Sequence, residues 1–282
     1  MQFSVLIPCY NEGHHVGKAL DDLIAKLSTS AYEYEIIVVD DASTDDSRDE
    51  IGKRPVTLIS HRFNKGYGAS LKTAAAQAKY DWLLFYDADG EHTPETLDSL
   101  FAAAPGADMV VGARTGRKGP FIRQPGKWLL TRVARYLTDF DIPDLNSGLR
   151  LVQRSIFNEF LPLYPDGFSL TTTITIAALK NHCVVRYVPI QTHKRDGGKS
   201  TVGWRDALMM ITLISRLITM FSPLKLFLSI AGVLFTLGFL SLVNDVIHLD
   251  LNESTYFLIT TSLIIFSFGL LADQIAEIRR RL

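Results

Sequence analysis

Short apolar runs alternate with longer helical patterns along the first 115 residues of the chain. The runs are nearly continuous in Val, Ile, Leu and aromatic residues, which is typical of strands covered on both faces of a sheet. Patterns with helical spacing separate several of them, and this alternation favours an α/β fold class with a parallel, doubly wound sheet. The predicted strands cover residues 3–8, 35–40, 56–60, 82–87 and 108–113, and the predicted helices cover residues 16–27, 70–79 and 94–104.

Polar side chains directly follow four of the predicted strands. In sheets of this class, ligands bind at the carboxyl ends of the strands. One such cluster is ordinary turn chemistry, but four that converge on one edge indicate a binding site. The clusters are Asn11-Glu12, Asp40-Asp41, Asn64-Lys65-Gly66 and Asp87-Ala88-Asp89.

The pattern is less regular from residue 116 to residue 202, where we place the end of this domain. Two basic, Gly-containing loops flank two predicted helices and one predicted strand. The loops are at 116–120 and 193–200, the helices at 127–137 and 169–181, and the strand at 184–190.

An amphipathic helix is predicted over residues 203–222. Its polar residues Arg205, Thr212, Arg216 and Thr219 mark one narrow stripe on an otherwise apolar surface. This pattern favours a helix lying in a membrane interface, with an ordinary core helix as the alternative.

Two uncharged apolar runs, 226–243 and 256–272, follow in residues 223–282. Each spans roughly 26 Å as a helix, at the short end for a bilayer core of about 30 Å. They predict a transmembrane hairpin, with a buried helical hairpin as the alternative.

The charges around the hairpin predict its orientation. The connector between the runs is acidic, whereas the flanks and the C-terminus are basic, so the positive-inside rule places both flanks in the cytosol. No basic leader precedes the first strand, so we expect no cleavable signal peptide. The expected location is the cytoplasmic (inner) membrane, multi-pass, with the catalytic domain and both termini cytoplasmic. The connector contains Asp245, Asp250 and Glu253, and the flanks contain Arg205, Arg216, Lys225 and Arg279, Arg280 and Arg281.

The composition argues against several classes of protein and of metal site. The 282 residues are 47% hydrophobic with a net charge of -1, which gives no sign of a nucleic-acid-binding surface. Cys9 and Cys183 lack C-x-x-C spacing, so neither a disulfide framework nor a thiolate metal site is expected. Asp87, Asp89 and Glu91 instead offer the hard oxygen ligands that suit Mg²⁺ or Mn²⁺ together with substrate phosphate.

Seven motifs occur in order: PCYNE (8–12), VVDDAS (38–43), NKGYGAS (64–70), DADGEH (87–92), GAR (112–114), DLNSGLR (144–150) and R-x-x-G-x-S (195–200). Over about residues 2–202 this ordered set resembles the family-2 glycosyltransferases, which have the GT-A (Rossmann-like) nucleotide-sugar fold. It is most similar to the polyprenyl-phosphate glycosyltransferases of the dolichol-phosphate mannosyltransferase type. The two-helix tail is similar to that of their bacterial members.

This resemblance implies metal-dependent, inverting transfer of one sugar from a UDP- or GDP-sugar to a membrane polyprenyl phosphate, undecaprenyl or dolichyl. The product would be a lipid-linked sugar donor made on the cytoplasmic face. A phosphate monoester has a second pKa of about 6, so the acceptor is largely dianionic at neutral pH and needs cations more than a base.

The resemblance also assigns roles to residues. Pro8, Tyr10 and Glu12 with Asp40 would line the nucleobase and ribose pocket, and Asp41 also suits ribose hydroxyls as a strand-end carboxylate. Asp87, Asp89 and Glu91 would hold the metal on the donor diphosphate. The phosphate candidates are Arg114, Arg123, Arg150 and Arg195. Further substrate candidates are Lys65, Gly66, Ala88, Ser147, Lys199 and Ser200.

Two positions depart from the family pattern. Glu91 stands where the family often has Gln, which adds a negative charge to the metal site. Thr201 stands where the closing loop usually has Lys; either Lys199 supplies the missing charge or the substrate differs.

Two rival functions remain open. The same fold could act on a glycan hydroxyl with Asp144 as the base, or serve as a non-catalytic membrane scaffold. A dinucleotide-dependent oxidoreductase is disfavoured, because no G-x-G-x-x-G follows the first strand. The sugar, the nucleotide, the polyprenol and the formation of a homo-oligomer are not determined by the sequence.

Overall fold

The computed structural model describes residues 1–115, 124–167, 169–191, 204–248 and 252–281. The chain divides into two compact units, Met1–Val202 and Gly203–Leu282, which are described separately.

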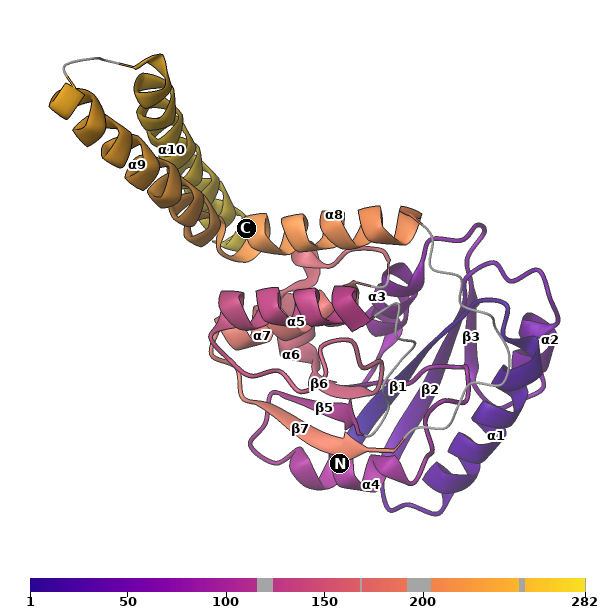
Figure 1. The fold of residues 1–282 in the computed structure, drawn as a ribbon. Helices are drawn as coiled ribbons and strands as arrows, with labels where there is room; N and C mark the ends of the chain where they lie inside the picture. The colour runs from indigo at the N-terminus through magenta and orange to yellow at the C-terminus, as the bar shows by residue number, and fades with distance from the viewer. Residues whose placement is uncertain (116–123, 168, 192–203, 249–251, 282) are drawn as a thin grey trace. The chain divides into compact units, whose positions relative to one another are not determined.

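The first unit is built on a sheet of seven strands in the described residues, with the order β3-β2-β1-β4-β6-β5-β7 (Figure 1). The six strands expected from the sequence are confirmed to within two residues at each end. The strands are β1 (Gln2–Cys9), β2 (Glu33–Asp40), β3 (Thr57–Ser60), β4 (Trp82–Phe85), β5 (Met109–Arg114), β6 (Arg150–Gln153) and β7 (Val185–Ile190).

The expectation of a wholly parallel sheet is wrong at β6. This strand runs antiparallel to both of its neighbours, β4 and β5. The sequence gives little signal for this strand, because only four residues are paired and the first of them, Arg150, is the last residue of the polar, Gly-containing DLNSGLR motif. Its direction matters for the site, since an antiparallel strand begins at the edge where its parallel neighbours end.

The helices cover both faces of the sheet (Figure 1). In α1, Val16, Leu20, Leu23 and Leu27 recur at helical spacing and are at most 1% exposed, which explains why this segment forms an amphipathic helix. They share a buried cluster with side chains of β1 and α4. On the opposite face, α3 packs against β1 and β2, and α6 packs near β6. The helices are α1 (Gly13–Ser28), α2 (Ser47–Gly52), α3 (Tyr67–Gln77), α4 (Thr96–Ala103), α5 (Gln124–Thr138), α6 (Arg154–Glu159) and α7 (Leu170–Lys180), with a 3-10 turn at Leu161–Leu163.

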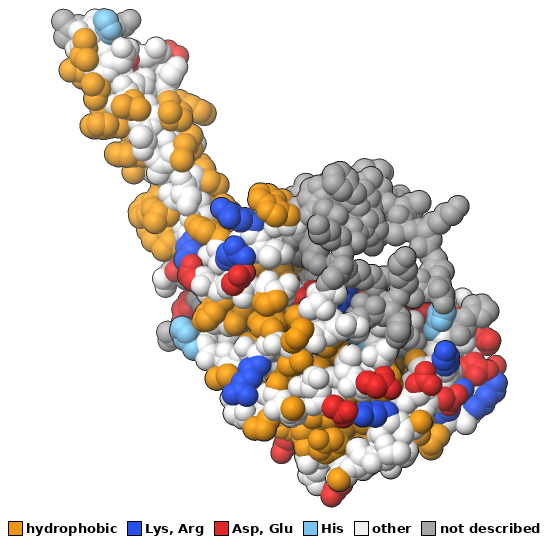
Figure 2. Space-filling view, turned by 60° about the horizontal axis from the view of Figure 1, so that its bottom comes forward, with side chains coloured by type: hydrophobic (Ala, Val, Ile, Leu, Met, Phe, Trp, Pro, Cys, Tyr) orange, Lys and Arg blue, Asp and Glu red, His pale blue; other side chains and the backbone are white. Residues whose placement is uncertain are grey.

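The second unit contains α8 (Trp204–Phe221), α9 (Pro223–His248) and α10 (Glu253–Arg281). Two 26-residue segments, Pro223–His248 and Glu253–Ile278, have mean hydropathies of 2.4 and 1.9 and are long and apolar enough to cross a membrane. Only 11% and 17% of an 18-residue apolar window in each segment is buried, unlike core helices of a soluble domain. Figure 2 shows hydrophobic side chains exposed along this hairpin.

The hairpin helices extend beyond the uncharged runs of the sequence. Asp245, expected in the connector, lies on α9 and is 4% exposed. Its Oδ2 accepts hydrogen bonds from the Thr255 hydroxyl at 2.5 Å and the Asn252 amide at 3.1 Å. The carboxylate therefore fastens the end of α9 to the start of α10.

Candidate active site

The expected site lies at one edge of the sheet. The parallel strands β1 to β5 end there, and β6 begins there, because Arg150 pairs with Phe85 on β4 and Val111 on β5. The antiparallel strand thus brings the 144–150 motif to the edge that holds the other polar clusters.

The loops that follow β1 and β2 are fastened to each other. Asn11, which has a φ of 54°, accepts a hydrogen bond from the Thr44 amide on its Oδ1 at 2.8 Å. The Glu12 amide donates to Ser47 Oγ at 2.8 Å, and Asp40 Oδ1 accepts from the Ser43 amide at 3.1 Å. The segments that hold the predicted nucleobase residues therefore form one wall. On it Tyr10 is 46% exposed, Pro8 and Glu12 are half-buried, and Asp40 is buried.

Asp41 differs from the expectation that it binds the ribose. It is 3% exposed, and its Oδ1 accepts from the Lys65 amide at 2.9 Å and contacts His61 Nδ1 at 2.6 Å. Its Oδ2 accepts from the Gly66 amide at 2.7 Å. The carboxylate therefore fixes the turn after β3. The Lys65 side chain is exposed, with its ammonium 5.6 Å from the Phe63 ring centroid.

The Asp87 carboxylate lies against three residues to which the sequence assigns no role. The Tyr67 hydroxyl donates to its Oδ1 at 3.0 Å, and His92 Nε2 lies 3.7 Å from its Oδ2. A Cβ on Gly148 would lie 2.0 Å from the same Oδ2. Burial raises the pKa of Asp87, but His92, Tyr67 and Arg114 outweigh it and hold the pKa below its usual range. Asp87 is therefore an anion fixed in direction, and the adjacent Ala88 is buried.

His92 is the last residue of the DADGEH motif, and the sequence assigns it no role. Its side chain is nevertheless buried, with 4% exposed, and faces Asp87. The Tyr86 hydroxyl donates to its backbone carbonyl at 2.8 Å, and its Nδ1 is buried without a hydrogen-bond partner in the described structure. The signal for both His92 and Tyr67 was their place inside the quoted motifs.

The carboxylates after β4 fit a divalent cation in part. Asp87 and Asp89 offer only hard oxygen donors, and Asp89 Oδ1 also accepts from the Glu91 amide at 3.0 Å. No group of three or more His, Cys, Asp or Glu side chains is arranged to hold a metal within the described ranges. The two carboxylates are oxygen donors of the kind that Mg²⁺ and Mn²⁺ take in sites where one or two carboxylates bind and a diphosphate and water complete the shell.

Arg114 and Asp144 form a bidentate ion pair. Arg114 Nε donates to Asp144 Oδ2 at 2.7 Å, and a terminal nitrogen donates to Oδ1 at 3.1 Å. The hydrogen bonds that Arg114 donates to the Asp144 carboxylate raise the pKa of Arg114 above its already high value. Asp144 is 2% exposed, whereas the Arg114 side chain is 24% exposed and can reach a ligand.

Arg150 also differs from the expectation that it contacts phosphate. It is 0% exposed, and it donates to the Ser147 and Thr171 carbonyls and, at 3.1 Å, to Thr175 Oγ1. Among the described residues its partners are neutral oxygens, and burial lowers its pKa. The guanidinium therefore ties the 144–150 motif to α7. The Ser147 hydroxyl is buried without a partner in the described part of the chain.

Four predicted substrate residues, Arg123, Arg195, Lys199 and Ser200, lie outside the described residues, as does Thr201. Their predicted roles stay predictions.

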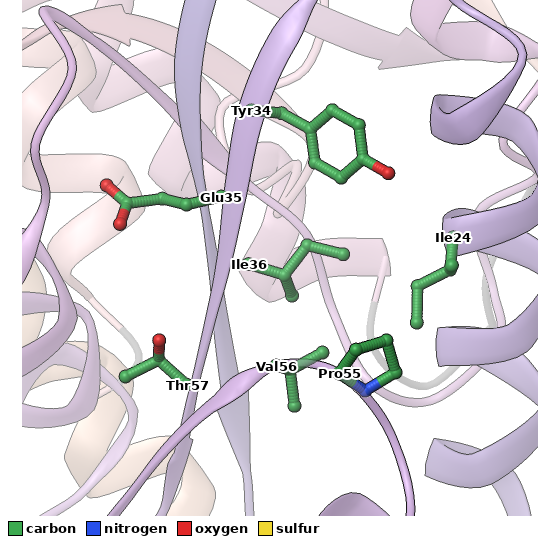
Figure 3. A pocket seen from close by; sticks show the side chains of 7 residues that line it. All are labelled: Ile24, Tyr34, Glu35, Ile36, Pro55, Val56 and Thr57. Atoms are coloured by element: carbon green, nitrogen blue, oxygen red, sulfur yellow. The ribbon is translucent and has the colours of Figure 1, made fainter.

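A hollow lined by seven residues lies away from this edge (Figure 3). Tyr34, Glu35 and Ile36 from the start of β2 line it together with Ile24 of α1 and residues 55–57. Glu35 accepts hydrogen bonds from Ser4 and the Lys79 amide. Because the hollow lies at the start of β2 and the polar clusters lie where the strands end, the hollow is not the candidate site.

Two family models match the chain. The model described as glycosyl transferase family 2 matches residues 4–161, and that of the GtrB C-terminal hairpin matches residues 222–278. Together they cover most of the first unit and the whole apolar hairpin.

Two relatives name the same class of acceptor. An undecaprenyl-phosphate 4-deoxy-4-formamido-L-arabinose transferase of Pseudomonas fluorescens is 30% identical over 248 residues, covering 81% of this chain and 67% of the relative. An undecaprenyl-phosphate mannosyltransferase of Micrococcus luteus is 29% identical over 217 residues, covering 71% and 87%.

Solved structures confirm the fold. Glucosyl-3-phosphoglycerate synthase from Mycobacterium tuberculosis, crystallised with Mn²⁺ and UDP-glucose, matches with a TM-score of 0.61 at 18% identity, covering 77% of this chain and 78% of that one. The first unit therefore has the GT-A-like mixed α/β fold. Motif order, family match and relatives agree that the chain is a glycosyltransferase and belongs to glycosyl transferase family 2.

Proposed function

We propose that the chain transfers a single sugar from a nucleoside-diphosphate sugar to the phosphate of a membrane polyprenol, with inversion. The observation that supports this most is the sheet edge. The ionised Asp87 follows β4 there, Arg114 ends β5, and Asp144 precedes β6, which lies between those two strands. The names of the undecaprenyl-phosphate relatives support the acceptor class.

Asp87 and Asp89 would hold Mg²⁺ or Mn²⁺, with Glu91 as a further oxygen donor. A bound divalent cation neutralises charge on the leaving diphosphate. In the protein, the Tyr67 hydroxyl and His92 keep the Asp87 carboxylate turned to one direction. Such prior orientation reduces the reorganisation needed when the donor binds.

Arg114 would bind phosphate oxygens of the donor or acceptor. Its guanidinium is fixed by Asp144, and its partial exposure leaves it accessible to a ligand. Asp144 is poorly placed as a general base, since both of its oxygens bind Arg114. This arrangement favours a phosphate acceptor, which is its own nucleophile, over a sugar hydroxyl.

Replacing Asp144 with Asn distinguishes the two acceptors. We expect transfer to polyprenyl phosphate to fall about tenfold, because Asn keeps one oxygen that can accept from Arg114 but loses the charge of the pair. No base is lost in this case, since the phosphate acceptor needs none. If a hydroxyl is the acceptor, removal of the base costs about 100-fold or more. The measurement is transfer of radiolabelled sugar in detergent, with the melting temperature recorded. The matched control is Asp141→Asn, whose side chain is 80% exposed; a loss of 100-fold for Asp144→Asn in a folded protein contradicts the proposal.

We further propose that the hairpin anchors the enzyme in the cytoplasmic membrane with the catalytic domain in the cytosol. Charge asymmetry supports this: Lys225 and the 279–281 arginines flank the hairpin, and Glu253 lies at its turn. In α8, Thr212, Arg216 and Thr219 are exposed, in keeping with an interfacial helix.

The catalytic unit has a further surface suited to an interface. Trp128, Leu129 and Tyr136 of α5 are 66%, 43% and 47% exposed, and Arg132 and Arg135 are exposed beside them. Aromatic and basic side chains together are typical of membrane interfaces.

Fractionation tests the membrane location. We expect the full chain to sediment with membranes after a high-salt wash and to need detergent for release, because the apolar side chains of α9 and α10 are exposed. Protease added to inside-out vesicles should digest the catalytic domain. Full-length protein in the soluble fraction without detergent, or protection of that domain in such vesicles, contradicts the proposal.

A further inference from the structure

A buried histidine that no motif includes lies beside the candidate site. His61 follows β3, and its side chain is 4% exposed, as is that of its partner Asp41. His61 Nδ1 lies 2.6 Å from Asp41 Oδ1, and Nε2 lies 2.9 Å from Thr73 Oγ1 on α3. The three residues thus connect the ends of β2 and β3 to the helix that follows.

The direction of these hydrogen bonds follows from donor chemistry. An ionised Asp41 only accepts, so the proton between the two residues is on His61 Nδ1. In the neutral imidazole Nε2 then accepts, and the Thr73 hydroxyl donates to it. His61 therefore donates a hydrogen bond to Asp41, and Asp41 also accepts hydrogen bonds from the Lys65 and Gly66 amides.

The turn fixed in this way is closely packed. Gly66 has a φ of +100°, and a Cβ there would lie 2.6 Å from the Asp166 carbonyl oxygen. The Ala69 amide donates to the same carbonyl at 3.0 Å. The position of the turn therefore depends on Asp41 on one side and on the 165–167 backbone on the other.

Tyr67 directly follows this turn as the first residue of α3, and its hydroxyl donates to Asp87 Oδ1 at 3.0 Å. We propose that His61 is a positioning residue for the transfer reaction. It orients Asp41, and Asp41 fixes the Lys65–Gly66 turn. The turn in its place positions the Tyr67 hydroxyl to donate to Asp87. The inference rests on the proposed function, in which Asp87 holds the divalent cation.

Two substitutions at one position separate this role from simple packing. His61→Asn places an amide N–H where Nδ1 lies and keeps a donor for Asp41, whereas His61→Gln places it where Nε2 lies and removes that donor. We expect His61→Asn to bind Mn²⁺ in the presence of UDP within about threefold of wild type, and His61→Gln about tenfold more weakly, as for loss of a buried charge-assisted hydrogen bond. The readout is free Mn²⁺ by electron paramagnetic resonance, which needs no turnover.

A double-mutant cycle tests the path through Tyr67. If His61 acts on Asp87 through Tyr67, the effects of His61→Gln and Tyr67→Phe on Mn²⁺ binding are not additive. The control is His182→Asn, an exposed histidine with a φ of 60° that Asn tolerates. Wild-type affinity in His61→Gln, equal weakening in both His61 variants, or additive effects would each overturn the inference.

Hydrogen exchange separates failure of this inference from failure of the proposed function. In the metal-free protein we expect the Lys65 and Gly66 amides to exchange faster in His61→Gln than in His61→Asn, because their acceptor Asp41 loses its support. A wild type that binds no Mn²⁺ contradicts the metal proposal alone. Equal exchange in the two variants contradicts the role of His61, whatever the metal result.

Discussion

Replacing Asp89 with alanine is expected to reduce sugar transfer by about 100-fold or more while the protein stays folded. The change removes an oxygen donor from the strand end where a divalent cation would supply several kcal/mol of charge stabilisation. Asp89 is half-buried in the turn that follows β4, and no core packing is lost. The measurement is the initial rate of transfer at saturating nucleotide sugar, with the melting temperature as the check on folding.

The matched control for this prediction is Asp98→Ala on α4. The Asp98 side chain is 64% exposed and pairs with Lys26, so its loss should leave transfer unchanged. Wild-type enzyme should lose activity in EDTA and regain it with Mn²⁺ or Mg²⁺. Full activity in chelator, or in the Asp89 variant, would show that the metal assignment is incorrect.

Gly148→Ala should reduce the rate of sugar transfer by roughly 100-fold, as for Asp89→Ala, but through a steric effect. The added Cβ would lie 2.0 Å from Asp87 Oδ2 and 2.7 Å from its Cγ, so either the carboxylate or the 144–150 motif must shift. A displacement of about 1 Å at a reacting centre costs roughly 100-fold in rate. Overpacking at a buried position costs about 1–3 kcal/mol of stability.

Gly52→Ala provides the control for Gly148→Ala, because it is the last residue of α2 and nothing lies within 4 Å of the added Cβ. It should keep wild-type activity and, at most, become slightly more stable. The comparison needs the rate and the melting temperature of both variants. A fully active Gly148→Ala protein would mean that the geometry of Asp87 does not matter for transfer.

The sequence predicted the strands well because their apolar runs are long and covered on both faces. It failed at β6, a strand of four residues that begins with the last residue of a polar motif and whose direction cannot be inferred from composition. The sequence also predicted hairpin helices that are shorter than those in the structure. Asp245 was expected in the connector but lies in α9, because its carboxylate accepts a hydrogen bond from Thr255 at the start of α10.

The sequence predicted at which edge of the sheet the polar clusters lie, but not the contacts that their side chains make. The strand-end rule located Asp40, Asp41 and Asp87 at one edge, and the structure agrees. It could not show that Asp41 faces inward to backbone amides, or that Arg150 is buried against α7. Such distinctions depend on which side of a loop faces solvent, and residue type and spacing do not determine that.

The most direct test of the account is transfer by the full-length wild-type enzyme in detergent, with purified undecaprenyl or dolichyl phosphate and a panel of UDP- and GDP-sugars. With Mn²⁺ or Mg²⁺ present, the account predicts a lipid-linked monosaccharide from at least one donor, with the nucleoside diphosphate released in equal amount. No lipid-linked product from any donor, together with transfer to a glycan hydroxyl, would contradict the acceptor and leave the fold and family unchanged.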